Sequence, residues 1–323
     1  MVEYSPMETT QSAPPTVLLV IPVFNEDEMV YVNLQTIAAA AAEIEPECSL
    51  RMLIVDDGST DGTTEELARY CAGEERARWI GFTRNFGKEA AIHAGLDHAD
   101  ADAVIVMDSD LQHPPELIPQ MVALWKKGLP VVEAWKSERG KESFASGVFV
   151  AAFYALFGYF SGLDLRGQSD FKLLDRSVVE EYRRLSERRR FFRGLVQWMN
   201  YPSARLPFVV PPRAAGQTSW GRWRLLRYAL DNLTSFSALP LQLVSWMGVL
   251  TLAVGFVIGG ISLYKKWVGV ALDGFTTVIL LIVFASGVLM LSLGIIGHYL
   301  ARIYEELKLR PHYVLKGTFL GRG

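Results

Sequence analysis

Apolar and amphipathic segments alternate along the first 135 residues of the chain. Short segments rich in β-branched and other apolar residues run over 16–24, 51–55, 78–82, 103–107 and 130–135, and apolar residues at helical spacing cover 29–42, 63–71, 88–99 and 116–127. Near-continuous apolar strands separated by helices are typical of a mostly parallel sheet that is covered on both faces. The pattern therefore predicts an α/β domain.

The second half of the chain carries two long uncharged stretches. No charged residue occurs from 232 to 264, and from 274 to 301 only His298 can titrate. A membrane core needs about 20 apolar helical residues, and each stretch is longer than that. We therefore expect a hairpin of two transmembrane helices within 232–303, over about 239–264 and 275–300. The alternative is a pair of buried helices in a large water-soluble core.

Positive charge is heavier on the flanks of this hairpin than in its turn. The flanks hold Arg222, Arg224, Arg227, Arg302, Lys308 and Arg310, and the turn holds Lys265 and Lys266. By the positive-inside rule both flanks face the cytoplasm. The polar residues 1–15 contain no signal-peptide core. We expect a multi-pass protein of the inner (cytoplasmic) membrane, with a flexible N-terminus over 1–15, a catalytic domain over 16–231 and a tail over 304–323, and with both termini in the cytoplasm.

Two further segments are candidates for the membrane surface. Residues 144–160 are apolar and aromatic, and about 17 residues is the lower limit for a span, so a helix in the interface or a core helix of the domain is expected. The segment 180–198 begins with a dense run of arginines. That run is either a solvated helix face or a surface that meets anionic lipid head groups.

Composition and charge narrow the class of protein. The 323 residues are 50% hydrophobic and 21% charged, which excludes a disordered chain. Two cysteines cannot form a disulfide framework, which indicates a reducing compartment. The net charge of −3 argues against nucleic acid as a partner. The charge is unevenly distributed: residues 1–130 carry −14 (22 acidic, 8 basic), and residues 131–323 carry +11 (13 acidic, 24 basic). This asymmetry indicates an anionic surface beside the second half.

Carboxylates follow three of the predicted strands. Glu26 comes after the first strand, Asp57 after the second, and Asp108 and Asp110 after the fourth. Ligands of parallel sheets bind at the carboxyl ends of the strands, so these side chains are expected to share one edge. Asp108 and Asp110 are two residues apart, and oxygen ligands at this spacing suit Mg²⁺ or Mn²⁺.

Each acidic segment taken alone also has a structural explanation. Asn25 with Glu28 fits a helix capping box, Asp61-Gly62 fits a turn, and a lone Asp-x-Asp is usually solvated. No glycine-rich loop follows the first strand, which disfavours dinucleotide-binding and P-loop proteins.

Several motifs together resemble the family 2 glycosyltransferases, and within them the polyprenyl-phosphate (dolichyl-phosphate) sugar synthases. The motifs are IPVFNE at 21–26, VDDGSTDGT at 55–63, RNFGKEAA at 84–91, MDSDLQHPPE at 107–116, SDFKLLDR at 169–176, RFFRGLVQW at 190–198 and LDNLTSFS at 230–237. The resemblance implies a GT-A fold, which is α/β and Rossmann-like with a mostly parallel sheet, plus a C-terminal helical membrane hairpin. It also implies a nucleotide-sugar donor.

The resemblance carries roles onto individual residues. Base, ribose and sugar diphosphate are expected at Pro22, Phe24, Glu26, Asp57, Lys88, Asp108, Ser109 and Asp110, with Asp108, Asp110 and Gln112 facing Mg²⁺ or Mn²⁺. Asp170 matches the family's proposed catalytic position, and we place Asp110 with it as a catalytic candidate. Asp170 either accepts a proton or orients a cation or sugar hydroxyl. The alternative is a structural carboxylate that pairs with Lys172 or Arg176.

An acceptor phosphate needs cations near the donor, because two anions must meet. A lipid phosphate is largely dianionic at neutral pH and needs no strong base. Candidate cations are Lys136, Arg139, Lys172, Arg190, Arg193 and Arg213. This chain departs from the family pattern at two places. Many relatives have Gly-x-Arg where this chain has Ala134-Trp135-Lys136. Many also have Lys or Tyr where this chain has Thr218-Ser219-Trp220.

The expected function is inverting, metal-dependent transfer of one sugar, glucose from UDP-glucose, to undecaprenyl phosphate. Alternatives with the same chemistry use N-acetylglucosamine, galactose, an aminoarabinose derivative or GDP-mannose. A processive polysaccharide synthase is disfavoured, because Gln197-Trp198 does not match its Gln-x-x-Arg-Trp motif. A non-catalytic membrane scaffold or transport subunit is the alternative from another class. The expected partners are the donor, the lipid acceptor and the bilayer, with a homotetramer as the oligomer.

Overall fold

The fold was analysed in a computed structural model, which describes residues 13–138, 167–187, 190–209, 239–269 and 275–316. The chain divides into two compact units, and each is described by itself. Unit 1 comprises Met1–Tyr154, Leu163–Thr218 and Pro311–Gly323, and unit 2 comprises Ala155–Gly162 and Ser219–Arg310. The expected surface segment 144–160 lies outside the described residues, as do Arg139 and Arg213.

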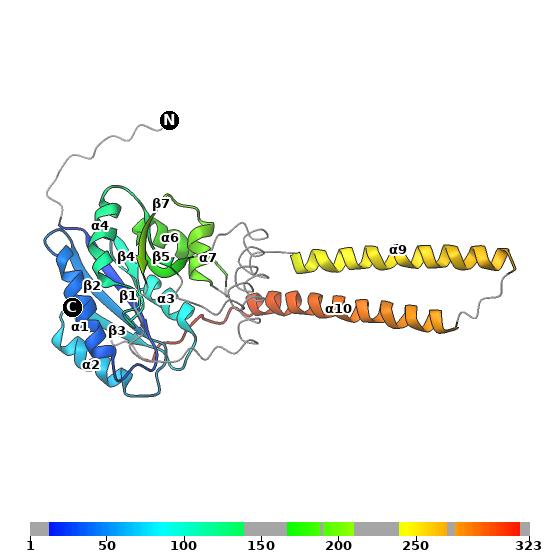
Figure 1. The fold of residues 1–323 in the computed structure, drawn as a ribbon. Helices are drawn as coiled ribbons and strands as arrows, with labels where there is room; N and C mark the ends of the chain where they lie inside the picture. Colours follow the sequence, from blue (N-terminus) through cyan, green and yellow to red (C-terminus); the bar gives the residue numbers. More distant parts are fainter. Residues whose placement is uncertain (1–12, 139–166, 188–189, 210–238, 270–274, 317–323) are drawn as a thin grey trace. The chain divides into compact units, whose positions relative to one another are not determined.

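Unit 1 is built on a seven-stranded sheet in the order β3-β2-β1-β4-β6-β5-β7 (Figure 1). The strands are β1 (Thr16–Val23), β2 (Ser49–Asp56), β3 (Ala77–Gly81), β4 (Ala103–Val106), β5 (Val131–Glu138), β6 (Gln168–Asp175) and β7 (Ser203–Val209). The pairs β1–β2, β2–β3, β1–β4 and β5–β7 are parallel, and β6 runs antiparallel to both β4 and β5. The mostly parallel α/β sheet is therefore confirmed, with β6 as its inverted member.

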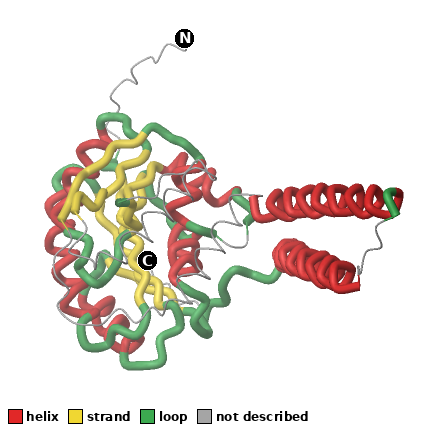
Figure 2. The backbone as a smooth tube through the Cα atoms, turned by 45° about the vertical axis from the view of Figure 1, so that its right-hand side comes forward, coloured by secondary structure: helices red, strands yellow, loops and turns green. Residues whose placement is uncertain are grey.

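Helices lie on both sides of this sheet (Figure 2). They are α1 (Val30–Ala41), α2 (Thr63–Gly73), α3 (Lys88–Asp97), α4 (Ile118–Lys126), α6 (Arg176–Arg184) and α7 (Phe192–Trp198), with short 3₁₀ turns η1 (Ala42–Ile44) and η2 (Pro115–Leu117). The four helices expected between the first five strands are all present. The segment 180–198 is divided between α6 and α7, because the chain turns to an extended conformation at Leu185.

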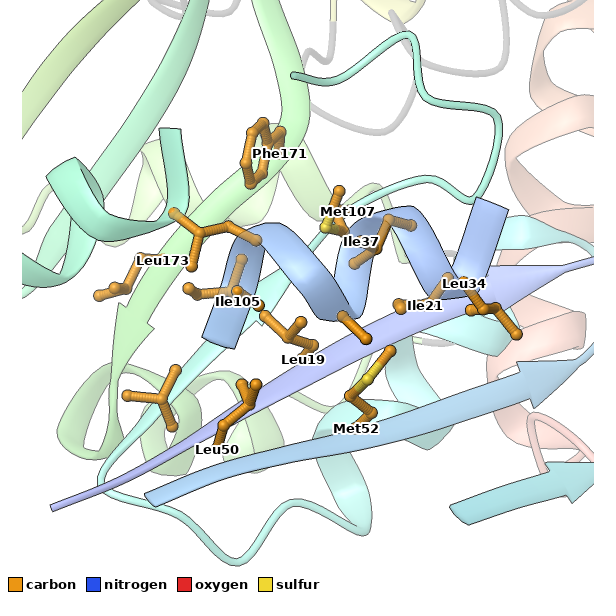
Figure 3. Packing of buried hydrophobic residues seen from close by; sticks show 14 of the residues in the cluster. Leu19, Ile21, Leu34, Ile37, Leu50, Met52, Ile105, Met107, Phe171 and Leu173 are labelled. Carbon is orange, nitrogen blue, oxygen red and sulfur yellow. The ribbon is translucent and has the colours of Figure 1, made fainter. Parts of the chain in front are cut away.

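Alternate residues of β1 face opposite layers, which explains why its sequence is apolar throughout. Leu19 and Ile21 point toward α1, where they meet Leu34 and Ile37 in the buried cluster of Figure 3. Val20 points toward α3 on the other face. There Gly95 approaches so closely that an added Cβ would lie 2.1 Å from a Val20 methyl carbon. The core thus fixes β1 from both sides and holds its carboxyl end in place.

Unit 2 contains two long helices, α9 (Leu239–Trp267) and α10 (Phe275–Leu307), which contact each other. Among the described residues, α10 holds one window, Phe284–Ala301, that is long and apolar enough to cross a membrane, and the apolar part of α9, Trp246–Ile261, is shorter. None of the Phe284–Ala301 window is buried, and large side chains such as Phe256 of α9 are exposed. Among the described residues, these apolar side chains are therefore not packed into a buried core.

Candidate active site

A cavity of about 310 Å³ lies at the carboxyl ends of β1, β2 and β4. It is lined by Pro22, Val23, Phe24, Glu26, Asp57, Asn85, Gly87, Lys88, Asp108, Ser109 and Asp110. All eight residues expected to contact the nucleotide sugar are among them. Parallel strands end at a common edge, and for this reason segments more than 80 residues apart in sequence meet here.

Asp57 organises one wall of the cavity from a buried position. Its carboxylate accepts hydrogen bonds from the Phe86 N–H (2.7 Å), the Gly87 N–H (2.9 Å) and the Asn85 side-chain amide (3.0 Å). Burial raises the pKa of Asp57, and the two backbone N–H groups oppose that rise. Asp57 thus holds the segment that connects β3 to α3, which brings Asn85, Gly87 and Lys88 to the cavity.

The β2–α2 loop beside this wall requires a glycine. Gly58 has φ +69°, and an added Cβ would lie 2.3 Å from the carbonyl carbon of Arg84. A side chain at position 58 would therefore push the β3–α3 segment away from Asp57.

Glu26 and Ser109 join β1 to the loop after β4. The Ser109 hydroxyl donates to the Glu26 carboxylate at 2.7 Å, and the Glu26 N–H donates to the Thr63 hydroxyl at 2.8 Å. Burial raises the pKa of Glu26 to about 7, and the carboxylates of Asp110 and Asp108 act in the same direction. Glu26 is therefore poised between its neutral and charged forms near neutral pH.

Asp108 and Asp110 face the cavity in different surroundings. Asp108 lies 2.6 Å from the Lys88 ammonium, and its backbone N–H donates to Nδ1 of His113 at 3.2 Å. Burial lowers the pKa of His113, so that its ring is neutral and Nδ1 is free to accept. Asp110 is exposed and accepts a hydrogen bond from the Gln112 N–H at 3.0 Å. Asp110 thus keeps a carboxylate oxygen available for a ligand.

The donor set fits a divalent ion that is shared with substrate phosphates. In the described part of the chain, no three His, Cys, Asp or Glu side chains form a site that could hold a metal by protein ligands alone. Mg²⁺ is usually held by one or two carboxylates together with phosphates and water, and Asp108 and Asp110 supply two. Gln112 is half-buried and does not line the cavity. Its backbone N–H donates to the Asp110 carboxylate.

Asp170 lies behind the cavity wall in a chain of alternating charges. Its side chain is 4% exposed and accepts hydrogen bonds from Lys88 Nζ (2.6 Å) and from Arg193 Nε (2.5 Å) and Nη2 (2.7 Å). Although burial opposes ionisation, Arg193 and Lys88 hold the pKa of Asp170 well below its usual range. Likewise, burial opposes charge on Lys88, but Asp108 and Asp170 hold its pKa above its usual value. The charged row Asp108–Lys88–Asp170–Arg193 therefore leads from the cavity to α7.

Two further candidate cations, Lys136 and Arg190, lie in different surroundings. Lys136 is half-buried near this row. Burial and the charge of Arg193 lower the pKa of Lys136, whereas the charges of Asp108 and Asp170 raise it. Arg190 is 9% exposed and donates to the carbonyl oxygens of Tyr182 (3.1 Å) and Leu185 (2.5 Å). The Arg190 guanidinium therefore ties α6 to α7 and is not presented to the donor cavity.

Lys172, which was expected at a phosphate, is fully buried. Its ammonium donates to Glu133 Oε1 at 2.8 Å, between the paired strands β5 and β6. Burial lowers the pKa of Lys172 against the opposing effect of Glu133. Because this ammonium is fully buried and paired within the sheet, we propose that Lys172 belongs to the core and does not contact a substrate phosphate.

A stability measurement tests this assignment. Glu133→Ala leaves the Lys172 charge buried without its partner, which costs about 3–5 kcal/mol and lowers the melting temperature by roughly 10 °C. The double replacement Glu133→Leu with Lys172→Met removes both charges and should recover most of that loss. If Glu133→Ala melts like the wild type while Lys172→Met alone abolishes turnover, Lys172 acts at the substrate after all.

Sequence reasoning missed several residues of the site. His113, Asn85 and Gly87 were not assigned, although the segment RNFGK directly follows the third strand and so had to reach the same edge. The partners of Asp170 were not predicted either. The structural alternative paired Asp170 with Lys172 or Arg176, whereas the structure pairs Asp170 with Lys88 and Arg193.

Comparisons with known proteins give this geometry a family. The profile of "Glycosyl transferase family 2" matches residues 18–183. The uncharacterized glycosyltransferase YkcC of Bacillus subtilis is 36% identical over 93% of this chain and 93% of its own length. The bactoprenol glucosyl transferase of Shigella phage SfII is 34% identical over 94% of this chain and 98% of its own.

A solved structure shares the fold. Glucosyl-3-phosphoglycerate synthase from Mycobacterium tuberculosis, in complex with Mn²⁺, UDP and glucosyl-3-phosphoglycerate, superposes with a TM-score of 0.50 at 17% identity, over 69% of this chain and 80% of that one. The GT-A-like sheet is thereby confirmed. The chain belongs to glycosyl transferase family 2 and is a glycosyltransferase.

Proposed function

We propose that the protein transfers one glucose from UDP-glucose to a polyprenyl phosphate, undecaprenyl phosphate in bacteria, at the cytoplasmic face of the membrane. The observation that carries this proposal is the match to bactoprenol glucosyl transferase over 94% of this chain and 98% of that one. A match of that extent includes both the catalytic domain and the two apolar helices, so it concerns the lipid acceptor as well as the donor.

The cavity can seat a nucleoside diphosphate with its sugar. Phe24 is 41% exposed, so its ring is open for a base to stack on. Asp108 and Asp110 would hold Mg²⁺ or Mn²⁺, which would neutralise the charge on the departing diphosphate. Lys88 adds a fixed positive charge on the same side, and Asp170 keeps that ammonium in position. These groups would stabilise the leaving group.

The acceptor needs little activation. A phosphate monoester is mostly dianionic at neutral pH, so one of its oxygens can attack the anomeric carbon as the bond to the diphosphate breaks. A single displacement of this kind inverts the configuration at that carbon. We assign the task of offsetting the incoming charge to Arg193, which ends the charged row, and to Lys136, which lies near that row.

A donor panel tests the choice of sugar. The purified protein, undecaprenyl phosphate and Mn²⁺ are incubated with UDP-glucose, UDP-galactose, UDP-N-acetylglucosamine or GDP-mannose, and release of nucleoside diphosphate is measured. We expect UDP-glucose to give the highest kcat/KM. A clear preference for another donor would keep the reaction class and change the sugar. No release of nucleoside diphosphate with any donor would favour the scaffold or transport alternative.

We further propose that α9 and α10 cross the membrane as a hairpin, with the catalytic domain and both termini in the cytoplasm. In a variant in which Cys71 is replaced by serine, a cysteine at Val268, just after α9, should react with an impermeant maleimide added to intact cells. The matched control, a cysteine at the exposed Lys127 of unit 1, should react only after the membrane is opened. Equal labelling of both cysteines in intact cells would contradict the hairpin.

A further inference from the structure

The chain that follows α10 pairs with the end of the edge strand in unit 1. We refer to residues 311–316 as the C-terminal strap. The edge strand is β3, and next to its end the Thr83 N–H donates to the Val314 carbonyl at 2.9 Å. The Lys316 N–H donates to the Gly81 carbonyl at 2.7 Å, and Leu315 pairs antiparallel with Phe82. The strap thus forms a single antiparallel bridge beside the carboxyl end of the edge strand β3.

The side chains of the strap hold both ends of the segment from β3 to α3. The Tyr313 ring stacks on the Phe82 ring at 5.1 Å and 15°, and its hydroxyl donates to the carboxylate of Asp97 at 3.3 Å. The His312 ring meets His93 edge to face at 4.9 Å. Phe82 follows β3 directly, and Asp97 is the last residue of α3. Tyr313 therefore contacts both ends of the segment that runs from β3 through α3.

The residues between those two ends form part of the donor cavity. The Phe82 ring packs edge to face against Phe86 at 5.7 Å, and the Phe86 N–H donates to Asp57 at 2.7 Å. Asn85, Gly87 and Lys88 of the same segment line the cavity. The segment 83–88 is therefore held by Asp57 on the cavity side and, through Phe82, by Tyr313 on the far side.

We propose that Tyr313 is a positioning residue for the nucleotide-sugar cavity. It touches no substrate; it fixes Phe82 and thereby the segment that delivers Lys88 and the Asp57-bound N–H groups. This inference rests on the proposed function for the identity of the donor, and on the contacts alone for the positioning role. An aromatic pair contributes enough beyond its buried area to change an equilibrium severalfold, so its loss is expected to be measurable at the cavity.

Two measurements on the full-length protein test the proposal. Tyr313→Ala should speed hydrogen exchange of the amides in 83–88 about fivefold and lower kcat/KM for UDP-glucose about fivefold. Tyr313→Phe keeps the stacked ring and loses the bond to Asp97, so it should behave much like the wild type. Val314→Ala is the matched control, because that side chain is 44% exposed and its backbone bond is unchanged.

Hydrogen exchange decides the positioning role independently of the donor. Unchanged exchange in 83–88 for Tyr313→Ala overturns the proposal, whichever nucleotide sugar the enzyme uses. Faster exchange that extends equally to the core strands β1 and β4 also overturns it, because that pattern reports general destabilisation. Absence of turnover of UDP-glucose by the wild type would refute the proposed donor and leave the exchange result to decide the role of Tyr313.

Discussion

Replacing Asp110 by alanine is expected to abolish sugar transfer, with a fall of about 10³-fold or more, while the fold stays intact. Asp110 is one of two carboxylates that line the cavity where the diphosphate must sit, and it is the more exposed of the two. Losing it removes half of the protein's ligands to a divalent ion that would stabilise the leaving group. Its contribution to stability should lie within about 0.5 kcal/mol, as for other exposed side chains.

The measurement is the rate of lipid-linked sugar formation beside a thermal melt. Asp100→Ala is the matched control, because Asp100 has a side chain that is 93% exposed and does not line the cavity. Chelation by EDTA should reproduce the Asp110→Ala defect in the wild type, and added Mn²⁺ or Mg²⁺ should reverse it there but not in the variant. Full activity of the wild type in EDTA would exclude the metal assignment.

Replacing Asp170 by asparagine should lower transfer by about 10²-fold without loss of UDP binding. The variant keeps the shape of the side chain but loses the charge that positions Lys88 and Arg193, and small misplacements of catalytic groups cost rates of this order. Asp170 does not line the cavity, so the donor contacts remain. Arg193→Gln should show a similar defect, because it removes the partner of the same carboxylate.

A pH–rate profile separates the two roles considered for Asp170. Since Arg193 and Lys88 hold its pKa well below the usual range, the carboxylate is ionised throughout any neutral assay and is a weak proton acceptor. We therefore favour orientation, and we expect raised pH not to rescue Asp170→Asn. Rescue at high pH would indicate proton acceptance. Lost UDP binding or unchanged transfer in Asp170→Asn would show that the positioning role assigned to Asp170 is wrong.

The strand ends of the site could be predicted because they depend on local pattern and on one rule of parallel sheets. Residues 103–107 are apolar without interruption, and Asp108 and Asp110 follow at once, so their place at the carboxyl edge needed no knowledge of other segments. The same reasoning located Glu26 and Asp57. The predicted helices between the strands also match, because their apolar residues recur at helical spacing.

What could not be predicted depends on long-range pairing. β6 was not recognised as a strand, because Asp170 and Lys172 interrupt its apolar residues, and those charges are buried only because partners exist across the fold. Lys88 lies 82 residues before Asp170, and Glu133 lies 39 before Lys172. Residue type alone made Lys172 a candidate for phosphate binding. Only its ion pair with Glu133 of the neighbouring strand β5 shows that its charge already has a partner.

The most direct measurement is the mass of the lipid product. Purified full-length protein is incubated with undecaprenyl phosphate, UDP-glucose and Mn²⁺, the lipid phase is extracted, and its mass spectrum is compared with that of a parallel reaction with Asp110→Ala. We predict a lipid phosphate heavier by one hexose residue, formed by the wild type and absent from the variant. An unchanged lipid phosphate in the wild-type reaction, with UDP released and glucose found only in the aqueous phase, would contradict transfer to a polyprenyl phosphate.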